Sequence, residues 1–528
     1  MKKISFMLIF FFTAVNAFAL APETHEDLNF RIIDKHQKAN EYLLNNLSIK
    51  NGVSQSFEFA GQLKSAREWI AYGGIKEDVT GIKYTRSLNH FHNPLVQNWQ
   101  DAGFQGKMSS AVWAQLENQS SLLGNYSWPD TRNYFFNALT METEIQRQAN
   151  YANCFRALGQ VMHIIEDASV PAHARNDFHY FPMYEDWLEE LRTGTTDDRA
   201  TYEGIVNITI PASNPFLTSR VGYNPDAHIP IAGFFDTDIY NGANPDATLS
   251  STIGMAEYTN ANFFSEDTIF KKYPYPGKTS FVPVDNYIAD PRYPNDPTKQ
   301  VLRKYYFKTG DGDSGYLLAA INYLPNYAIE YVPWLDFNSI DNTEWGTLDR
   351  LCYYEYARKL IPRAISYSSA LLDYFFRGQI DAVDAKATKD ESGNIKGVTL
   401  KVKNATPGET MFMVNGSSPT SFLVVSYSYK KPDGTKVYGK SGEVHLTSNI
   451  SSGNDTSSDT YKYTFTFSAP IPADAKEEQY MLVYRGKLGQ EEDTVAGKKL
   501  KVDVVMIDDW ERNDVLWVSK DSRGELSI

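Results

Sequence analysis

Apolar residues recur every three to four positions through most of the first two-thirds of the chain, a spacing that predicts amphipathic helices. Pro129 stands where one such helix can start, and Gly378 stands where the last one can end. The expected helices cover Lys64–Tyr72, Ser109–Asn118, Asp130–Leu139, Glu142–Glu166, Tyr184–Arg192 and Thr343–Phe376.

The stretch from Thr195 to Thr309 departs from this pattern, because Pro, Asn, Gly and Tyr are frequent there and periodic runs are few. Long irregular segments within a compact domain are usually covers or insertions that serve a function. We therefore expect this stretch to wall a functional cleft, with one short helix near Leu249–Phe264.

Beyond Gly378 the pattern changes to a period of two, which predicts β-strands. Val398, Leu400 and Val402 alternate with polar residues, and Phe422–Tyr429 is a strand-like run before a Pro-Asp-Gly turn. Alternation returns at Tyr463, Phe465 and Phe467 and is followed by an apolar run at Tyr480–Tyr484. Short strands separated by turns favour a β-sandwich.

A chain of 528 residues is expected to form two or more domains. The patterns predict a mainly α-helical domain over residues 20–378, an all-β sandwich over residues 379–505 and a C-terminal tail over residues 506–528.

Residues 1–19 combine two lysines, an apolar run and a small-residue end, as a secretory signal peptide does. The run from Ile4 to Ala14 is shorter than the roughly 18 residues that span a bilayer. We expect a secreted or periplasmic protein with no transmembrane segment. Cleavage after Ala19 would leave Leu20 as the mature N-terminus, and cleavage after Ala17 is the alternative.

The formal net charge of −14 argues against long-range attraction of polyanions, and no cluster of Lys and Arg stands out. We therefore expect no stable complex with nucleic acid. This charge alone does not exclude a nuclease, because bound metal ions can supply a local positive field. The two cysteines, Cys154 and Cys352, lie in apolar helical patterns, and structural thiols are slightly favoured over a disulfide.

Five acid and histidine side chains between Gly159 and Trp187 indicate a metal site. His163 and Asp167 are four residues apart on one helical face, and Pro171 turns the chain before His173. His179 and Glu185 follow closely. A single histidine on an apolar face is usually a hydrogen-bonded core residue, but five such groups would be costly to bury without a shared cation. Imidazole and carboxylate ligands together suit zinc.

The spacing H-x(3)-D-x(3)-P-x-H-x(2)-N, from His163 to Asn176, resembles the motif of zinc-dependent phospholipase C, a group that shares its fold with single-strand-specific nucleases. His25 lies in THEDLNFRII, Asp78 in EDVTG, and His90 in HFHNP, which resembles the family's His-Phe-Tyr-Asp-Pro. The resemblance extends over roughly Leu20 to Gly378 and is carried by these motifs.

The resemblance implies three zinc ions. Asp78, His90, His163 and Asp167 would hold the first, with Asp167 bridging to a second that His25 and the amino group of Leu20 complete. The third would take His173, His179 and Glu185, although the spacing after His173 departs from the family pattern. Asp78 and Asp167 would be the catalytic residues, with Asp78 orienting or deprotonating the nucleophile.

Some of these assignments have alternatives that remain open. Glu257 competes with Glu185 for the third position, and His92 could replace His90 if the loop is shifted. Asn176 and Asp177 would orient histidines or cap a helix. The remaining histidines, which lack an acid or His one helical turn away, are interpreted as structural or solvent-exposed: His36, His228 and His445.

The expected function is that of a secreted zinc-dependent phosphodiester hydrolase, a phospholipase C that acts on glycerophospholipids. A single-strand nuclease or nucleotidase of the same superfamily and a non-catalytic, metal-stabilised surface protein are the alternatives. A helical zinc domain followed by a sandwich resembles the two-domain toxin-type phospholipases C, in which the sandwich engages membrane lipid. Glycan binding, surface anchoring or a purely structural role are the alternatives for this domain.

Overall fold

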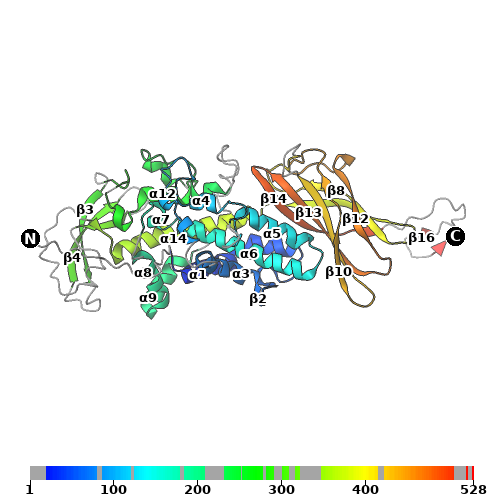
Figure 1. Ribbon diagram of the computed structural model, residues 1–528, viewed down its shortest axis with the longest axis horizontal. Helices are drawn as coiled ribbons and strands as arrows, with labels where there is room; N and C mark the ends of the chain where they lie inside the picture. Colours follow the sequence, from blue (N-terminus) through cyan, green and yellow to red (C-terminus); the bar gives the residue numbers. More distant parts are fainter. Residues whose placement is uncertain are drawn as a thin grey trace, which may run out of the picture.

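The computed structural model describes residues 20–79, 86–119, 124–178, 183–208, 231–250, 252–270, 272–277, 281–289, 300–308, 315–321, 346–413, 421–504, 519–520 and 526–527. The described part of the chain is elongated, with a helical region in the middle and a region of antiparallel sheets at one end (Figure 1). The expected class, a mainly helical region followed by a β-sandwich, is confirmed.

The helices follow the apolar periodicity, and their ends are set by caps. Ser127 starts α5 at Trp128, because its hydroxyl accepts from the Asp130 N–H while the Asp130 carboxylate accepts from the Ser127 N–H. The helices are α1 (Pro22–Lys35), α2 (Gln37–Glu41), α3 (Ala66–Val79), α4 (Ser110–Trp113), α5 (Trp128–Thr140), α6 (Glu144–Asp167), α7 (Pro171–Ala174), α8 (Met183–Thr193), α9 (Thr196–Val206), α11 (Ala232–Phe235), α12 (Met255–Asn262) and α14 (Arg350–Phe375).

Helix α6 is the centre of the helical region, and its second half is buried on every side. It crosses α3 at two glycines: a Cβ added to Gly159 would lie 1.9 Å from the Ile70 carbonyl oxygen, and one added to Gly73 would lie 2.2 Å from the Arg156 carbonyl oxygen. The two backbones therefore touch. This close crossing brings the C-terminal end of α3 beside the last turns of α6.

The segment expected to be mostly irregular, Thr195 to Thr309, contains the first two strands of a four-stranded sheet that the sequence analysis did not predict. Its strands run antiparallel in the order β3-β4-β5-β6 and lie at the end of the molecule opposite the sandwich (Figure 1). Their bounds are β3 (Phe281–Ala289), β4 (Gln300–Lys308), β5 (Tyr316–Ile321) and β6 (Gly346–Thr347). The expected short helix is present as α12, and a small hairpin, β1 (Ser56–Phe59) and β2 (Gln62–Ser65), precedes α3.

The C-terminal region is a sandwich of two sheets, with orders β10-β9-β13-β14 and β12-β8-β7-β15. Alternate residues of both sheets meet in one core, in which Leu400 and Phe465 of one sheet join Val425 and Leu482 of the other. The strands are β7 (Ile380–Lys389), β8 (Ile395–Asn404), β9 (Phe422–Lys430), β10 (Lys436–Lys440), β11 (Val444–His445), β12 (Lys462–Ile471), β13 (Lys476–Leu488), β14 (Glu491–Leu500), β15 (Asp503–Val504), β16 (Ser519–Lys520) and β17 (Leu526–Ser527).

A buried ionic network joins the helical region to the sandwich. Glu491 of β14 accepts from Arg132 Nε of α5 at 2.8 Å and from Arg377 Nη1 at 2.6 Å, and Arg377 also contacts Glu409. Trp128 Nε1 donates to the same Glu491 carboxylate. Burial raises the pKa of Glu491, but the two guanidinium charges outweigh it and lower this pKa to about 2. Each charge in this network therefore has a partner.

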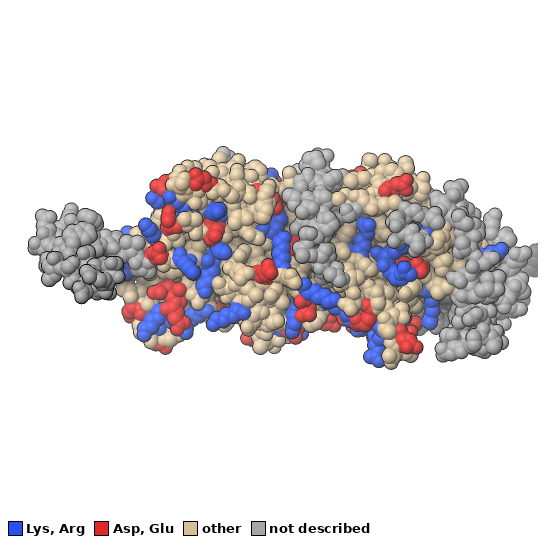
Figure 2. Space-filling view, turned by 180° about the vertical axis from the view of Figure 1, so that it is seen from behind, with Lys and Arg blue, Asp and Glu red and all other residues tan. Residues whose placement is uncertain are grey.

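Three further features bear on the sequence predictions. Cys154 and Cys352 are free, buried thiols, in agreement with the slight preference for structural thiols over a disulfide. Acidic and basic side chains are interspersed on the described part of the face in Figure 2, in keeping with the lack of a Lys and Arg cluster in the sequence. No helix in the described ranges is both long and apolar enough to span a membrane.

Glu491→Gln should destabilise the protein by about 3–5 kcal/mol at pH 7, because it leaves two buried guanidinium groups without their shared counter-charge. A carboxyl with a folded pKa near 2 and an unfolded pKa of about 4.3 contributes stability that is present above about pH 4 and is lost as the pH falls toward 2. Urea denaturation at pH 7 and at pH 3 measures both effects. The variant should lose less stability on acidification than the wild type, and exposed Glu492→Gln is the matched control. Equal urea midpoints for Glu491→Gln and wild type at pH 7 would contradict this account.

Candidate metal centre

The last turns of α6 present His163 and Asp167 to a buried cluster of imidazoles and carboxylates. The helix ends at Asp167, and Pro171, at the first position of α7, redirects the chain so that His173 follows within two residues. His25 comes from α1, which the sequence prediction had not identified as a helix, and Asp78 comes from the end of α3.

Asp167 is the hub of this cluster, since its carboxylate approaches three imidazoles. Asp167 Oδ2 lies 2.6 Å from His90 Nδ1 and 3.2 Å from His163 Nε2, and Oδ1 lies 3.0 Å from His25 Nε2. Asp78 Oδ1 completes the cluster on another side, 3.7 Å from His163 Nε2 and 3.6 Å from His90 Nδ1. All five side chains are fully buried.

The donor atoms converge as ligands do around a cation. In a tetrahedral zinc site with bonds of 2.0–2.2 Å, neighbouring donors stand about 3.4 Å apart. The contacts of the imidazoles with Asp167 and Asp78 lack hydrogen-bond geometry. Within the described ranges, no hydrogen-bond partner is present for His25 Nε2, His90 Nδ1, His163 Nε2 or either carboxylate oxygen of Asp78 and Asp167. Buried polar atoms without partners are costly, and a metal ion would satisfy them.

Two overlapping groups could each hold a metal ion: His25, His163 and Asp167 form one, and Asp78, His90 and His163 form the other. His163 belongs to both groups, and Asp167 also lies beside His90. The chemistry of these donors fits zinc, because nitrogen and carboxylate oxygen are ligands that it readily accepts.

A surrounding layer of hydrogen bonds orients the imidazoles. The Gly74 carbonyl lies 2.7 Å from His163 Nδ1, which leaves Nε2 facing the carboxylates, and Glu166 lies 2.6 Å from His25 Nδ1. Glu77 Oε1 is 3.5 Å from His90 Nε2. Such outer partners set the tautomer and raise the basicity of a ligand imidazole.

The sequence prediction missed Glu77 and Glu166 as members of this layer. Each directly precedes a cluster acid, in the pairs Glu77-Asp78 and Glu166-Asp167. In a helix, adjacent residues point about 100° apart, so one acid of each pair can face the cluster while the other supports a neighbouring histidine. Four further Glu-Asp pairs occur elsewhere in the chain, so the pair alone does not reveal this layer.

The electrostatics of the cluster favour a bound cation. Burial lowers the pKa of His25, but the Asp167 and Glu166 carboxylates outweigh it and raise this pKa to about 9; for His90 the balance, dominated by Asp167, raises the pKa to about 10. Burial raises the pKa of Asp78. Without metal the cluster therefore retains protons that zinc must displace, which makes zinc affinity fall as the pH falls.

The residues expected at a third metal position are not all gathered in the described structure. His173 is buried in α7, with Nδ1 3.1 Å from the His90 carbonyl oxygen and its ring stacked on Phe91 at 4.1 Å. His179, expected at the same position, lies outside the described residues. Leu20, whose amino group was expected at the second position, is fully buried. Neither His173 nor Glu185 belongs to the two groups above. The third position stays a prediction.

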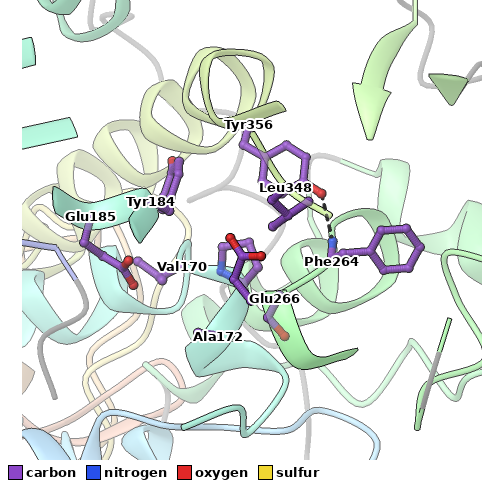
Figure 3. A pocket seen from close by; sticks show the side chains of 10 residues that line it. Val170, Ala172, Tyr184, Glu185, Phe264, Glu266, Leu348 and Tyr356 are labelled. Atoms are coloured by element: carbon purple, nitrogen blue, oxygen red, sulfur yellow. Dashed lines mark hydrogen bonds between the residues drawn. The ribbon is translucent and has the colours of Figure 1, made fainter. Parts of the chain in front are cut away.

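Glu185 lines a small pocket of about 30 Å³ beside α7 (Figure 3). The lining is largely apolar and aromatic, with Glu266 as its second carboxylate. The residues labelled there are Val170, Ala172, Tyr184, Glu185, Phe264, Glu266, Leu348 and Tyr356. Tyr353 donates a hydrogen bond to Glu266 from α14.

The competing residues have other partners. The Glu257 carboxylate accepts backbone N–H groups of Thr237, Ile239, Tyr240 and Gly254, so it holds a loop together. His92 Nε2 lies 2.7 Å from Asp236, and it is His90 that faces Asp167.

The residues expected to orient histidines or cap a helix hold loops instead. The Asn176 side chain donates to the carbonyls of Ala102 and Gly103, and Asp177 accepts the Asp267 N–H. Of the other histidines, His36 is buried beside the Ser369 carbonyl, His445 is exposed, and His228 lies outside the described residues.

No family model matches the chain, and no curated protein matches it. Among solved structures it is similar to the alpha toxin of Clostridium absonum, with 12% identity and a TM-score of 0.27, over 90% of this chain and 99% of the other. It is also similar to Clostridium perfringens alpha-toxin from avian strain SWCP, with 10% identity and a TM-score of 0.22, over 92% and 99%. TM-scores this low decide neither fold nor activity.

Asp167→Asn should remove most bound zinc, because an amide carries no charge and Asp167 faces three imidazoles. Glu166→Gln, which alters the contacts with His25 Nδ1 and with the Ser368 hydroxyl, should weaken zinc binding by about 10–100-fold. Zinc content by mass spectrometry and circular dichroism of the same samples check this. Wild-type zinc content in the Asp167→Asn protein would refute the role of the hub.

Glu185→Gln should lose about one zinc per chain if Glu185 completes a third position, while Glu257→Gln should keep all its zinc. The latter should instead cost about 1–3 kcal/mol of stability, since an amide nitrogen would face backbone N–H groups. Zinc stoichiometry and thermal melting of both variants distinguish them. The reverse outcome, with zinc lost only from Glu257→Gln, would move the ligand assignment to Glu257.

Proposed function

We propose that this protein is a zinc-dependent phosphodiester hydrolase with phospholipase C activity on glycerophospholipids, exported from the cell that makes it. The observation that carries the proposal is the Asp167 carboxylate, placed among three imidazoles with Asp78 opposite. Asp167 approaches His25 with one carboxylate oxygen and His90 with the other, so it could bridge two neighbouring cations, as in the two-metal sites of phosphate-processing enzymes. His163 has one imidazole nitrogen free and would bind one of these cations. The motif from His163 to Asn176 supports the same reading.

Bound zinc would supply a Lewis acid that neutralises phosphoryl oxygens and activates water. The chain itself supplies position and proton handling. Gly74 fixes the His163 tautomer, Glu166 fixes that of His25, and the buried donors keep their geometry through the close contact of α3 and α6. We propose Asp78 as the group that orients the attacking water and accepts its proton, because its carboxylate faces His90 and His163 and burial raises its pKa.

The pocket beside α7 favours a lipid over a nucleotide as the substrate. Val170, Phe264 and Leu348 offer apolar surface to an acyl or glycerol group. Burial raises the pKa of Glu266 to about 8, so this carboxyl is largely neutral at pH 7 and costs an apolar ligand little. The pocket adjoins α7, which carries His173, and thus lies beside the third metal position proposed for His173, His179 and Glu185.

Single-strand nuclease activity is the second candidate. Phe104 and Phe178 form a stacked pair with ring centroids 5.2 Å apart, and Phe104 also contacts Phe91, on which His173 stacks. Aromatic faces of this kind bind unpaired bases. The two candidates share one metal centre and differ in the surface that would hold the rest of the substrate.

The zinc-loaded protein, prepared to start at Leu20 because its amino group is a proposed donor, should hydrolyse phosphatidylcholine vesicles and release phosphorylated head group. Turnover of single-stranded DNA should be at least tenfold slower. Asp167→Asn is the control and should lose at least a hundredfold of the activity, in step with its zinc. Release of nucleotides with no release of phosphocholine would replace the first candidate by the second, and inactivity on both substrates with full zinc would leave a structural metal site.

A further inference from the structure

A second cleft lies between the helical region and the sandwich, away from the metal cluster. The N-terminal turns of α6 form one side of it, and the β10-β9-β13-β14 sheet forms the other. It has a volume of about 220 Å³ and is open to solvent on one side. Arg147 precedes His163 by 16 residues on α6, so at about 1.5 Å per residue the two sites are roughly 24 Å apart along the helix.

Three cations face this cleft without acidic partners. Arg147 lies over one ring, that of Tyr438, with Cζ 4.7 Å from the centroid, and Lys436 Nζ lies 4.8 Å from the same centroid. Lys499 of β14 is the third. Across the described ranges, none of them has a carboxylate at ion-pair distance, although Glu144 lines the rim.

Arg147 is the most constrained of these cations. Its Nε donates to the Met141 carbonyl at 2.6 Å, while its Nη2 is buried without a hydrogen-bond partner. Burial lowers the pKa of Arg147, and only tyrosine rings, no carboxylates, act against that shift. A guanidinium in this position is stabilised by any anion that reaches it.

The contrast with the ionic network in the same interface shows that the cations of this cleft are not simply packing elements. Arg132 and Arg377 are buried between the same two regions, and each has the carboxylate of Glu491 as a partner. The interface thus pairs Arg132 and Arg377 with a carboxylate but leaves Arg147 without one beside an open cleft. This difference suggests that a ligand carries the negative charge that Arg147 lacks.

The rest of the lining is polar and aromatic. Gln148 and Gln479 offer amides, Ser428 offers a hydroxyl, and Tyr151 and Tyr438 contribute aromatic rings. Tyr480 also borders the cleft, but its ring packs in the core of the sandwich. Amides and hydroxyls pair with sugar hydroxyls, whereas tyrosine rings present the flat, amphipathic surface on which a sugar ring can lie.

We propose that this cleft binds an acidic sugar, whose anionic group contacts Arg147, Lys436 and Lys499 and whose ring lies against the tyrosines. The ligand is a hexuronic acid or a comparable carboxylated or phosphorylated sugar, free or at the end of a glycan. Because residues of α6 and of four strands of one sheet build the cleft, the site exists only when the two regions are in contact.

Isothermal titration calorimetry on the full chain tests the proposal with glucuronate, glucose 6-phosphate, glucose and inorganic phosphate as probes. Glucuronate or glucose 6-phosphate should bind at least tenfold more tightly than glucose and than inorganic phosphate. An oligosaccharide ending in glucuronate that binds more tightly than free glucuronate would identify a glycan as the source, and equal affinity would identify the free sugar. No binding of either acidic sugar at about 10 mM, or equal binding of phosphate and glucose 6-phosphate, would overturn the proposal.

Variants of the lining separate this site from the metal centre. Arg147→Gln should weaken acidic-sugar binding at least tenfold, and the double variant Lys436→Gln/Lys499→Gln, at more exposed positions, gives a second test if Arg147→Gln folds poorly. Lys431→Gln, an exposed lysine at the turn before β10, is the matched control and should bind as the wild type does. Asp167→Asn should also bind normally. Unchanged binding in both the arginine and the double lysine variants would refute the site.

Discussion

The structure depends on the burial of negative charge at the end of α6. Asp167 has no access to water, and a lone carboxylate in such surroundings would be too costly to keep ionised. The imidazole of His163 on the same helix and those of His25 and His90 from two other parts of the chain offset that cost only in part. Several of their nitrogens have no hydrogen-bond partner among the described residues. The buried Asp167 carboxylate therefore requires positive charge close by. This requirement explains why His25, His90 and His163 meet although they lie far apart in sequence.

The sequence revealed the part of this centre that is local. His163 and Asp167 are one helical turn apart, and the proline that ends the helix region is visible in the sequence, so their common face could be predicted. His25 was expected to take part, but α1 was not recognised as a helix. Glu77 and Glu166 were missed because their role depends on which neighbour each faces, and only the packing of α3 and α1 against α6 decides that.

Non-local pairing accounts for most of what the sequence did not disclose. Strands β3 and β4 lie in a stretch rich in Tyr, Asn and Pro, which has the composition of a loop, and their place in a sheet depends on pairing with neighbouring strands. The sandwich, in contrast, was predictable because its strands alternate cleanly and its turns carry Pro, Asp and Gly. The link between the two regions rests on Glu491 and its arginines, and nothing in the local sequence distinguishes that glutamate from its exposed neighbour Glu492.

The contact between α3 and α6 sets a dimensional limit on the metal centre. Gly73 and Gly159 let one backbone rest on the other, and a single methyl group at either position would occupy space already taken by a carbonyl oxygen. The lack of a side chain at these two glycines therefore sets the separation of the two helices. For that reason Asp78 Oδ1, at the end of α3, lies 3.7 Å from His163 Nε2 on α6. The two glycines thus fix how far apart the donor atoms carried by α3 and α6 can lie, and so limit the size of the ion that fits between them.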